Sequence, residues 1–236
     1  MKAIILNSGE GKRLKPITEK IPKCLVKVNG KTILDYQLEN LVNCGIKEII
    51  ITTGPFENLI KKRIKQKYPD LNIKYVNNPK YSSTNYIYSL WLTKEMINNS
   101  IILLHGDLIF DAILLKKLIG SKYDNCVLIN ENIKPPEKDF KGVIENEKVK
   151  KIGISFFGDN AFFLAPLYKF SKLDFIKWLN EIDIFIKEGK TKCYAEDAFN
   201  NISEKIQLFP LFYDKEVCME IDDYNDIKIA KRNLSK

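Results

Sequence analysis

The sequence contains only one histidine, His105, and its five cysteines are far apart and form no CxxC pair. A histidine-dependent catalytic triad and a histidine-based zinc site are therefore excluded. The cysteines are typical of small buried side chains rather than of a disulfide framework. We interpret His105 as a residue at the end of a strand.

Long apolar segments are missing as well. No apolar run approaches the ~20 residues that cross a bilayer, and the run after Lys2 is only four residues long, which argues against a secretory signal. We therefore expect a cytoplasmic protein without membrane insertion. With 236 residues, 45% of them hydrophobic and 29% charged, the chain has the size and composition of one large α/β domain.

The net charge of +8 is spread along the whole chain, and no basic run with interleaved aromatic residues stands out. Nucleic acid is therefore not an expected partner. The excess of lysine is typical of solvated surface charge and gives only weak support for anionic small-molecule substrates.

Two common phosphate motifs are also absent from the loop that follows the first predicted strand, residues 3–6. Leu14 stands where GxGxxG requires a third glycine, and no GxxxxGK[ST] sequence occurs. The loop does contain Gly9 and Gly11, and Lys12 and Arg13 follow directly. A flexible loop followed by cations suits phosphate, although two glycines alone are also typical of a simple turn.

A longer pattern decides between these alternatives. Residues 9–31 read GEGKRLKPITEKIPKCLVKVNGK. This segment resembles the GxGxRLxPxTxxxPK signature of nucleotidyltransferases that make nucleotide-activated sugars and alcohols. Residues 78–90, NPKYSSTNYIYSL, are most similar to phosphocholine cytidylyltransferases and their phosphonate-using relatives. The chain departs from the family where Asn7 and Ser8 replace two alanines and where Ile154 replaces a frequent lysine.

The order of predicted elements favours a doubly wound, mostly parallel mixed sheet, as in Rossmann-like nucleotidyltransferases. Residues 3–77 alternate between strand and helix patterns, which is typical of a parallel sheet with helices on both faces. Residues 143–164 predict a small antiparallel insertion, with strands at 155–157 and 162–164. Helices are expected near 171–187 and 223–234. We expect one domain, residues 1–236, with a nucleotide-binding half of about 1–130 and an acceptor-binding half of about 131–236.

Asp107 follows a buried strand, and the carboxyl ends of such strands are where ligands bind. The resemblance implies catalytic roles for Arg13, Lys23, Asp107 and Asp222, with CTP as substrate and with Mg²⁺ held by the two aspartates. A helix cap is the alternative for the late aspartates, and it is favoured for Asp223. The resemblance also implies a nucleotide site formed by the loop, a Thr-Asn pair and the glycine before Asp107: Leu6, Asn7, Ser8, Gly9, Glu10, Gly11, Lys12, Arg13, Thr84, Asn85 and Gly106. The Ser/Thr/Asn cluster at 82–85 is also typical of an N-cap.

Phenylalanines in the second half and the acidic cluster after them indicate the acceptor. These residues are Phe140, Phe156, Phe162, Phe163, Tyr194, Glu196 and Asp197. Aromatic faces and carboxylates together attract organic cations, although the phenylalanines also suit a core and the acids a helix N-terminus. We expect Lys23, Tyr194, Glu196 and Asp197 to bind a small phosphorylated or phosphonylated amine, phosphocholine or 2-aminoethylphosphonate, with Asp197 nearest the cation.

Three other interpretations stay open. A sugar 1-phosphate could replace the amine as acceptor. The chain could also be a nucleotide-binding regulatory relative without catalysis, or a different α/β protein that binds a small ligand. Because Arg13, Lys23, Asp107 and Asp222 are all present, an active enzyme is favoured.

Overall fold

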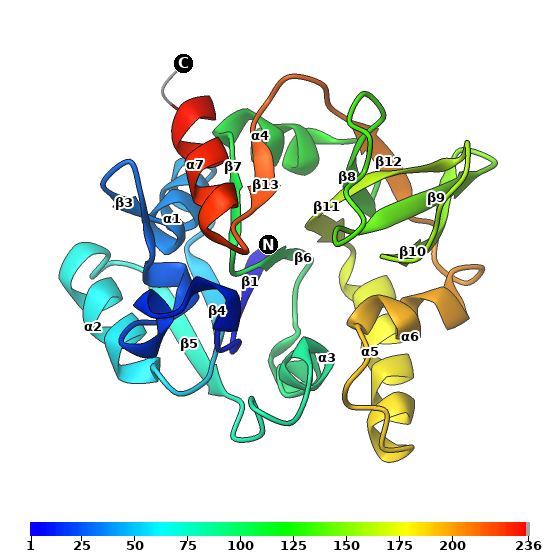
Figure 1. Ribbon diagram of the computed structural model, residues 1–236. Helices are drawn as coiled ribbons and strands as arrows, with labels where there is room; N and C mark the ends of the chain where they lie inside the picture. The colour runs from blue at the N-terminus through cyan, green and yellow to red at the C-terminus, as the bar shows by residue number, and fades with distance from the viewer. Residues whose placement is uncertain (235–236) are drawn as a thin grey trace.

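The fold is built around a nine-stranded sheet that has β1 (Lys2–Asn7) in its interior (Figure 1). The computed structural model describes residues 1–234. The strands β6 (Ile101–His105), β1, β4 (Glu48–Thr53) and β5 (Asn72–Asn77) are hydrogen-bonded in parallel in this order. Within residues 1–234, no helix has the length and apolar character that a membrane span requires.

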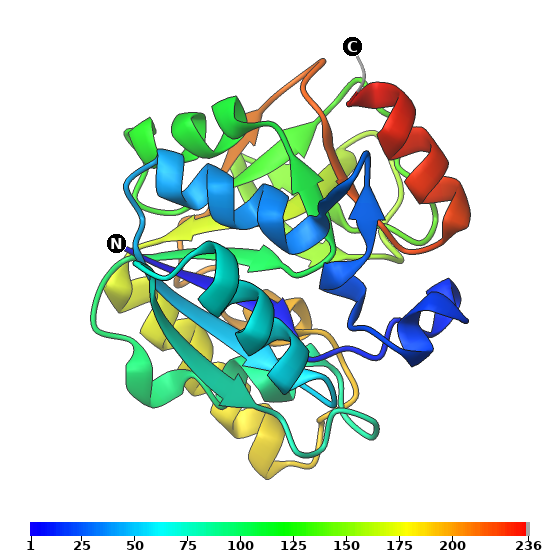
Figure 2. The same ribbon diagram turned by 90° about the vertical axis from the view of Figure 1, so that its left-hand side faces the viewer.

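Helices cover both faces of the sheet, so β1 must be apolar on both sides. Ala3 and Ile5 pack in one core with α1 (Ile33–Asn43), α2 (Glu57–Lys67) and α4 (Ala112–Gly120). The alternate residues Ile4 and Leu6 pack in a second core with α3 (Tyr86–Trp91), α5 (Lys172–Lys187) and α6 (Ala195–Ile202). Figure 2 shows α1 and α4 on one side of the sheet and α5 on the other. The expected doubly wound, mostly parallel mixed sheet is confirmed.

The antiparallel part continues this sheet. β11 (Ala161–Phe170) pairs antiparallel with β6, with β8 (Cys126–Asn130) and with β9 (Lys141–Glu145), and β9 forms a hairpin with β10 (Lys148–Gly153). β12 (Phe209–Phe212) adds to β8 in parallel. The predicted strand at 162–164 is thus a piece of the longer β11. The predicted strand at 155–157 is wrong, because the chain bends there and Gly158, with a φ of 131°, turns it back.

A second, two-stranded sheet was not predicted. β7 (Leu108–Phe110), which closely follows β6, pairs antiparallel with β13 (Cys218–Glu220). Next to this pair, Ile221 N donates a hydrogen bond of ordinary length, 3.0 Å, to Asp107 O. This pairing places the segment before α7 (Tyr224–Asn233) against the end of β6.

The motif segment itself is mostly irregular. It contains three short 3₁₀ helices, Lys12–Leu14, Ile17–Glu19 and Lys23–Leu25, followed by β2 (Lys27–Val28) and β3 (Lys31–Thr32). Of residues 25–28, only Lys27 and Val28 form a strand. Thr32 caps α1, because its Oγ1 accepts from Asp35 N at 3.1 Å.

Candidate active site

The site lies at the carboxyl ends of β1 and β6. The chain leaves β1 toward β4 on one side, and β6 lies on the other side, so this edge is a topological switch point. A cavity of about 460 Å³ opens here, and a smaller cavity of about 170 Å³ adjoins it. The two share the lining residues Gly9, Tyr81, Thr84, Asn85, Tyr86, His105 and Asp107.

The loop after β1 forms one wall of the larger cavity. Gly11 has a φ of 65°, and a Cβ there would lie 3.0 Å from Thr18 Cγ2 and 3.1 Å from Lys23 Cβ. Thr18 Oγ1 donates to Gly11 O at 2.8 Å. The motif glycine, threonine and lysine therefore touch one another, which explains why these residue types occur at fixed spacing.

Lys23 stands at the centre of the charged groups. Its Nζ donates to Asp107 Oδ2 at 2.5 Å and to Asp222 Oδ1 at 2.7 Å. Arg13 Nη2 lies 2.7 Å from the same oxygen of Asp222. All four of the predicted catalytic residues meet at this cavity, although they come from three distant parts of the sequence.

Opposite charges keep Lys23 and Asp107 ionised. Burial alone would lower the pKa of Lys23, but the two carboxylates outweigh it and raise the pKa above its usual value. Burial alone would raise the pKa of Asp107, but the charge of Lys23 dominates and the pKa is lowered. The cavity thus contains a compensated group of fixed charges near neutral pH.

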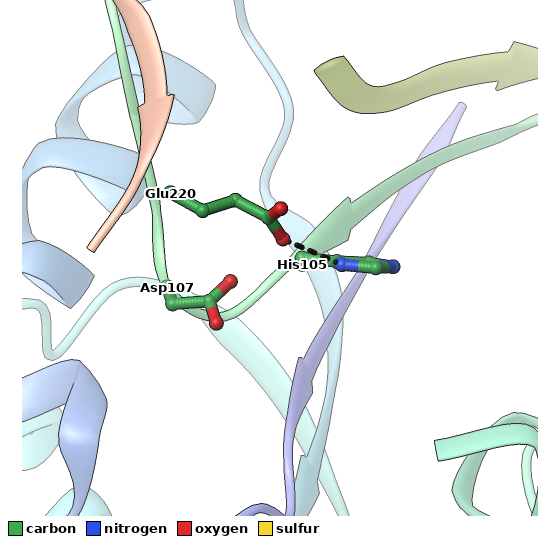
Figure 3. Close-up of side chains that lie close together, drawn as sticks. All are labelled: His105, Asp107 and Glu220. Carbon is green, nitrogen blue, oxygen red and sulfur yellow. Dashed lines mark hydrogen bonds and ion pairs between the residues drawn. The ribbon is translucent and has the colours of Figure 1, made fainter. Parts of the chain in front are cut away.

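His105 and Glu220 extend the polar cluster, and neither was predicted as a site residue. A hydrogen bond of 2.9 Å joins His105 Nδ1 and Glu220 Oε1, and Asp107 lies beside them (Figure 3). Burial alone would lower the pKa of His105, but Glu220 outweighs it and raises the pKa from 6.5 to about 9. Burial and the charge of Asp107 raise the pKa of Glu220 from 4.5 to about 7. Ligand atoms of His105, Asp107 and Glu220 lie within 4.8 Å of one another, so Glu220 is a further possible metal ligand.

The smaller cavity is formed by residues that were predicted to bind the nucleotide. Leu6, Ser8, Gly9, Thr84, Asn85 and Gly106 line it. Gly106 has no room for a side chain, because a Cβ would lie 2.5 Å from Leu6 O and 1.8 Å from Asn7 Oδ1. Asn7 lines neither cavity, whereas Glu10, Gly11, Lys12 and Arg13 line the larger one.

Aromatic rings form the opposite wall of the larger cavity. The centroid of Tyr86 lies 4.7 Å from that of His105 and 5.9 Å from that of Tyr194. Phe140 completes the group, with its centroid 5.1 Å from Tyr194 and 5.9 Å from His105. Of the four phenylalanines that were predicted for the acceptor side, only Phe140 lines this cavity.

The predicted acidic residues lie behind this wall. Glu196 is buried, and its two oxygens accept from the hydroxyls of Tyr86 and Tyr168. Asp197 Oδ2 accepts from Tyr194 N at 2.8 Å and so caps α6. Neither residue lines the cavity. Of these two acids, Glu196 orients the ring of Tyr86, and Asp197 has the capping role that was the alternative interpretation.

Lys138 is a cavity residue that sequence reasoning missed. Its Nζ lies 2.8 Å from Asp226, 3.7 Å from Asp223 and 3.9 Å from Asp222. Ile154, which replaces the family's frequent lysine, lines the same cavity. No sequence signal marks Lys138, because it follows two prolines in the irregular segment between β8 and β9.

Comparisons with known proteins agree with this geometry. Residues 2–154 match the family model described as Nucleotidyl transferase. The choline-phosphate cytidylyltransferase of Streptococcus pneumoniae is 32% identical over 209 residues, which cover 80% of this chain and 89% of that protein. The CMP-5'-(3-aminopropyl)phosphonate synthase of Streptomyces rubellomurinus is 29% identical over 135 residues, 57% of this chain and 22% of that protein.

The overall structure is similar to that of a solved relative over nearly its whole length. The structure of CTP:phosphocholine cytidylyltransferase from Streptococcus pneumoniae has a TM-score of 0.81 and 26% identity, covering 99% of this chain and 98% of that one. The family resemblance expected from residues 9–31 and 78–90 is confirmed.

Proposed function

Because the chain belongs to the nucleotidyl transferase family, we propose that it transfers CMP from CTP to a small phosphorylated or phosphonylated amine and releases pyrophosphate. The observation that carries this proposal is the meeting of Arg13, Lys23 and two aspartates at one cavity beside a glycine loop. The similarity to cytidylyltransferases supports CTP as the nucleotide.

The reaction needs positioning and charge rather than proton transfer. An anionic oxygen of the acceptor attacks the α-phosphorus of CTP and forms a new P–O bond. The bond from this phosphorus to the bridging oxygen breaks, and pyrophosphate leaves with the electron pair. Cations that neutralise the growing charge carry much of the rate in such reactions.

The wall of the larger cavity that residues 9–23 form, which we call the phosphate wall, suits these roles. The amides of Gly9 and Gly11, with Lys12 and Arg13, hold the triphosphate. Lys23 contacts the α-phosphate and the acceptor oxygen from the centre of the cavity. The nucleoside occupies the smaller cavity, against Thr84 and Asn85.

Asp107 and Asp222 would hold Mg²⁺. Asp107 Oδ1 is buried and accepts no hydrogen bond from any residue in the range 1–234, and carboxylate oxygens are ligands that Mg²⁺ prefers. The residues present therefore fit a divalent cation. Bound there, Mg²⁺ would orient the phosphates and stabilise negative charge at the α-phosphorus.

The aromatic wall favours an acceptor with a positive charge. Tyr86, Phe140 and Tyr194 present ring faces and edges to a cavity that also contains Glu220. Because Glu196 is occupied by two hydroxyl groups and Asp197 caps α6, Glu220 replaces Asp197 as the proposed carboxylate nearest the cation. Among residues 1–234, no tryptophan lines the cavity, so a primary amine such as 2-aminoethylphosphonate suits it as well as phosphocholine does.

Pyrophosphate release with a panel of substrates tests the proposal. CTP, UTP, GTP, ATP and dTTP are each combined with phosphocholine, phosphoethanolamine, 2-aminoethylphosphonate and glucose 1-phosphate, and kcat/KM is compared. We expect the highest value with CTP and one of the amines. A clear preference for glucose 1-phosphate would contradict the acceptor assignment, and no release with any pair would favour a nucleotide-binding protein without catalysis.

A further inference from the structure

The ammonium group of Lys23 lies between the two carboxylates that are proposed to bind the metal. Its Nζ is 2.5 Å from Asp107 Oδ2 and 2.7 Å from Asp222 Oδ1, and the Lys23 side chain is only 16% exposed. A single protein cation thus bridges both carboxylates at hydrogen-bond distance, and a metal that used these oxygens would have to displace it.

The cations around Asp222 are the same groups that the proposed function assigns to the phosphates. Arg13 Nη2 lies 2.7 Å from Asp222 Oδ1, the oxygen that Lys23 also contacts. Before any ligand binds, the aspartates and the phosphate-binding cations therefore neutralise one another. These cations cannot pair with the aspartates and with a triphosphate at the same time.

We propose that Lys23 occupies the divalent-cation position until a triphosphate draws its ammonium group away, so that metal and triphosphate enter the site as an exchange of ionic partners. This inference rests on the proposed function and deepens it. A lone metal ion would leave Lys23 largely buried without a counter-ion, and a lone triphosphate would deprive Asp107 of Lys23 and leave Asp222 with the more distant Lys138, at 3.9 Å. Breaking one partner out of a buried ion pair is costly, whereas a simultaneous exchange leaves every charge paired.

Lys23 is suited to this role, whereas the other loop cations are not. The side chains of Lys12 and Arg13 are 68% and 60% exposed, so water and salt compensate them when they leave a partner. The Lys23 side chain is only 16% exposed, so water and salt compensate its charge much less when it leaves a partner.

Binding of Mn²⁺ without nucleotide tests the proposal directly. Free Mn²⁺ is measured by electron paramagnetic resonance in titrations of the wild type and of Lys23→Gln. We expect the variant to bind Mn²⁺ at least about tenfold more tightly, because an attractive charge at this distance is removed from both ligands. No turnover is involved, so the result does not depend on the identity of the acceptor.

Two variants serve as matched controls. Lys2→Gln removes another nearly buried lysine with a carboxylate partner, Glu48, at the opposite end of β1, and should leave Mn²⁺ binding unchanged. Arg13→Gln removes an exposed cation from the same oxygen of Asp222 and should give a smaller gain than Lys23→Gln. An equal gain for Arg13→Gln, or none for Lys23→Gln, would overturn the proposal.

A measurement on the wild type keeps the proposal testable if Lys23→Gln does not fold. Inorganic tripolyphosphate, which has no base, is titrated with and without Mn²⁺ and its affinity for the protein is compared. We expect the affinity to rise at least about tenfold with Mn²⁺, and the affinity for Mn²⁺ to rise by the same factor with tripolyphosphate. Independent binding would refute the exchange, whereas a wrong nucleotide or acceptor assignment would leave this result intact.

Discussion

The two walls of the cavity are built in different ways. The phosphate wall comes largely from one continuous stretch, residues 9–23, and consists of backbone, lysine and arginine. The aromatic wall is assembled from Tyr86, Phe140 and Tyr194, which lie in three separate parts of the chain. One wall has charged side chains on a loop, and the other has rings whose neighbouring centroids lie 5.1 and 5.9 Å apart.

This difference follows from what each wall has to bind. A triphosphate is recognised by amides and cations that a short loop can supply, so its recognition leaves a compact pattern in the sequence. An acceptor is recognised by the shape of an enclosed surface, which needs contributions from many elements. Variants on the phosphate wall should therefore affect chemistry, whereas variants on the aromatic wall should affect the choice of acceptor.

The largest effect is expected from Lys23→Ala. The central cation of the phosphate wall would be lost, and kcat should fall by about 10²–10³-fold or more, as for other preorganised charges. Pyrophosphate release measures the rate, and circular dichroism checks that the variant folds. Lys12→Ala, which removes an exposed cation paired with Glu10, should cost far less. Near-normal turnover of Lys23→Ala would refute the assignment.

Asp222→Asn should have the next largest effect. The amide keeps the shape but is a poorer metal ligand, so we expect activity to fall about 100-fold and the Mg²⁺ requirement to rise. EDTA should abolish the activity of the wild type. The neighbouring Asp223 caps α7, so Asp223→Asn should leave turnover nearly unchanged. Full activity of Asp222→Asn at an unchanged Mg²⁺ requirement would make this aspartate structural.

A smaller and more selective effect is expected from Tyr194→Leu. The loss of a ring face from the aromatic wall should raise KM for the acceptor about 2–30-fold, the range that one cation–π contact is worth. KM for CTP should not change. Tyr194→Phe keeps the ring and should stay close to the wild type. Equal changes in both KM values would mean that the two walls are not separate in function.

The smallest effect concerns pH and stability. Because the pKa of His105 in the folded protein is raised to about 9, its contribution to the free energy of unfolding is complete below about pH 6.5 and is lost as the pH rises through about 9. The stability advantage of the wild type over His105→Gln should therefore shrink by about 1–3 kcal/mol over this range. Urea unfolding at several pH values measures it. A constant difference would mean that His105 is neutral in the folded protein.

The same difference between the walls explains what the sequence could predict. The loop with Gly9, Gly11 and Lys23 and the ends of the strands are determined by local backbone geometry. The sequence pattern and its spacing were therefore sufficient to predict them. The capping role of Asp223 is local as well, and it is observed.

The remaining features depend on contacts between distant segments. β7 is only three residues long and exists because β13 pairs with it, so β7 and this pairing did not stand out in the sequence. His105 became part of the site because Glu220 lies opposite, 115 residues away. Asp197 was expected near the acceptor but caps α6. The local sequence could not distinguish these roles, because an acidic residue in the first turn of a helix can be either a ligand-binding residue or a cap.

The pairing of β7 with β13 also determines when the protein gains its site during synthesis. The phosphate loop and Asp107 are translated well before Asp222, which follows β13. Bringing Asp222 next to Asp107 joins two distant parts of the chain, which has an entropic cost, and this contact cannot form before β13 is present. A nascent chain would thus hold Lys23 with Asp107 as its only partner of the two aspartates, and the charged cluster would become complete when Asp222 is added.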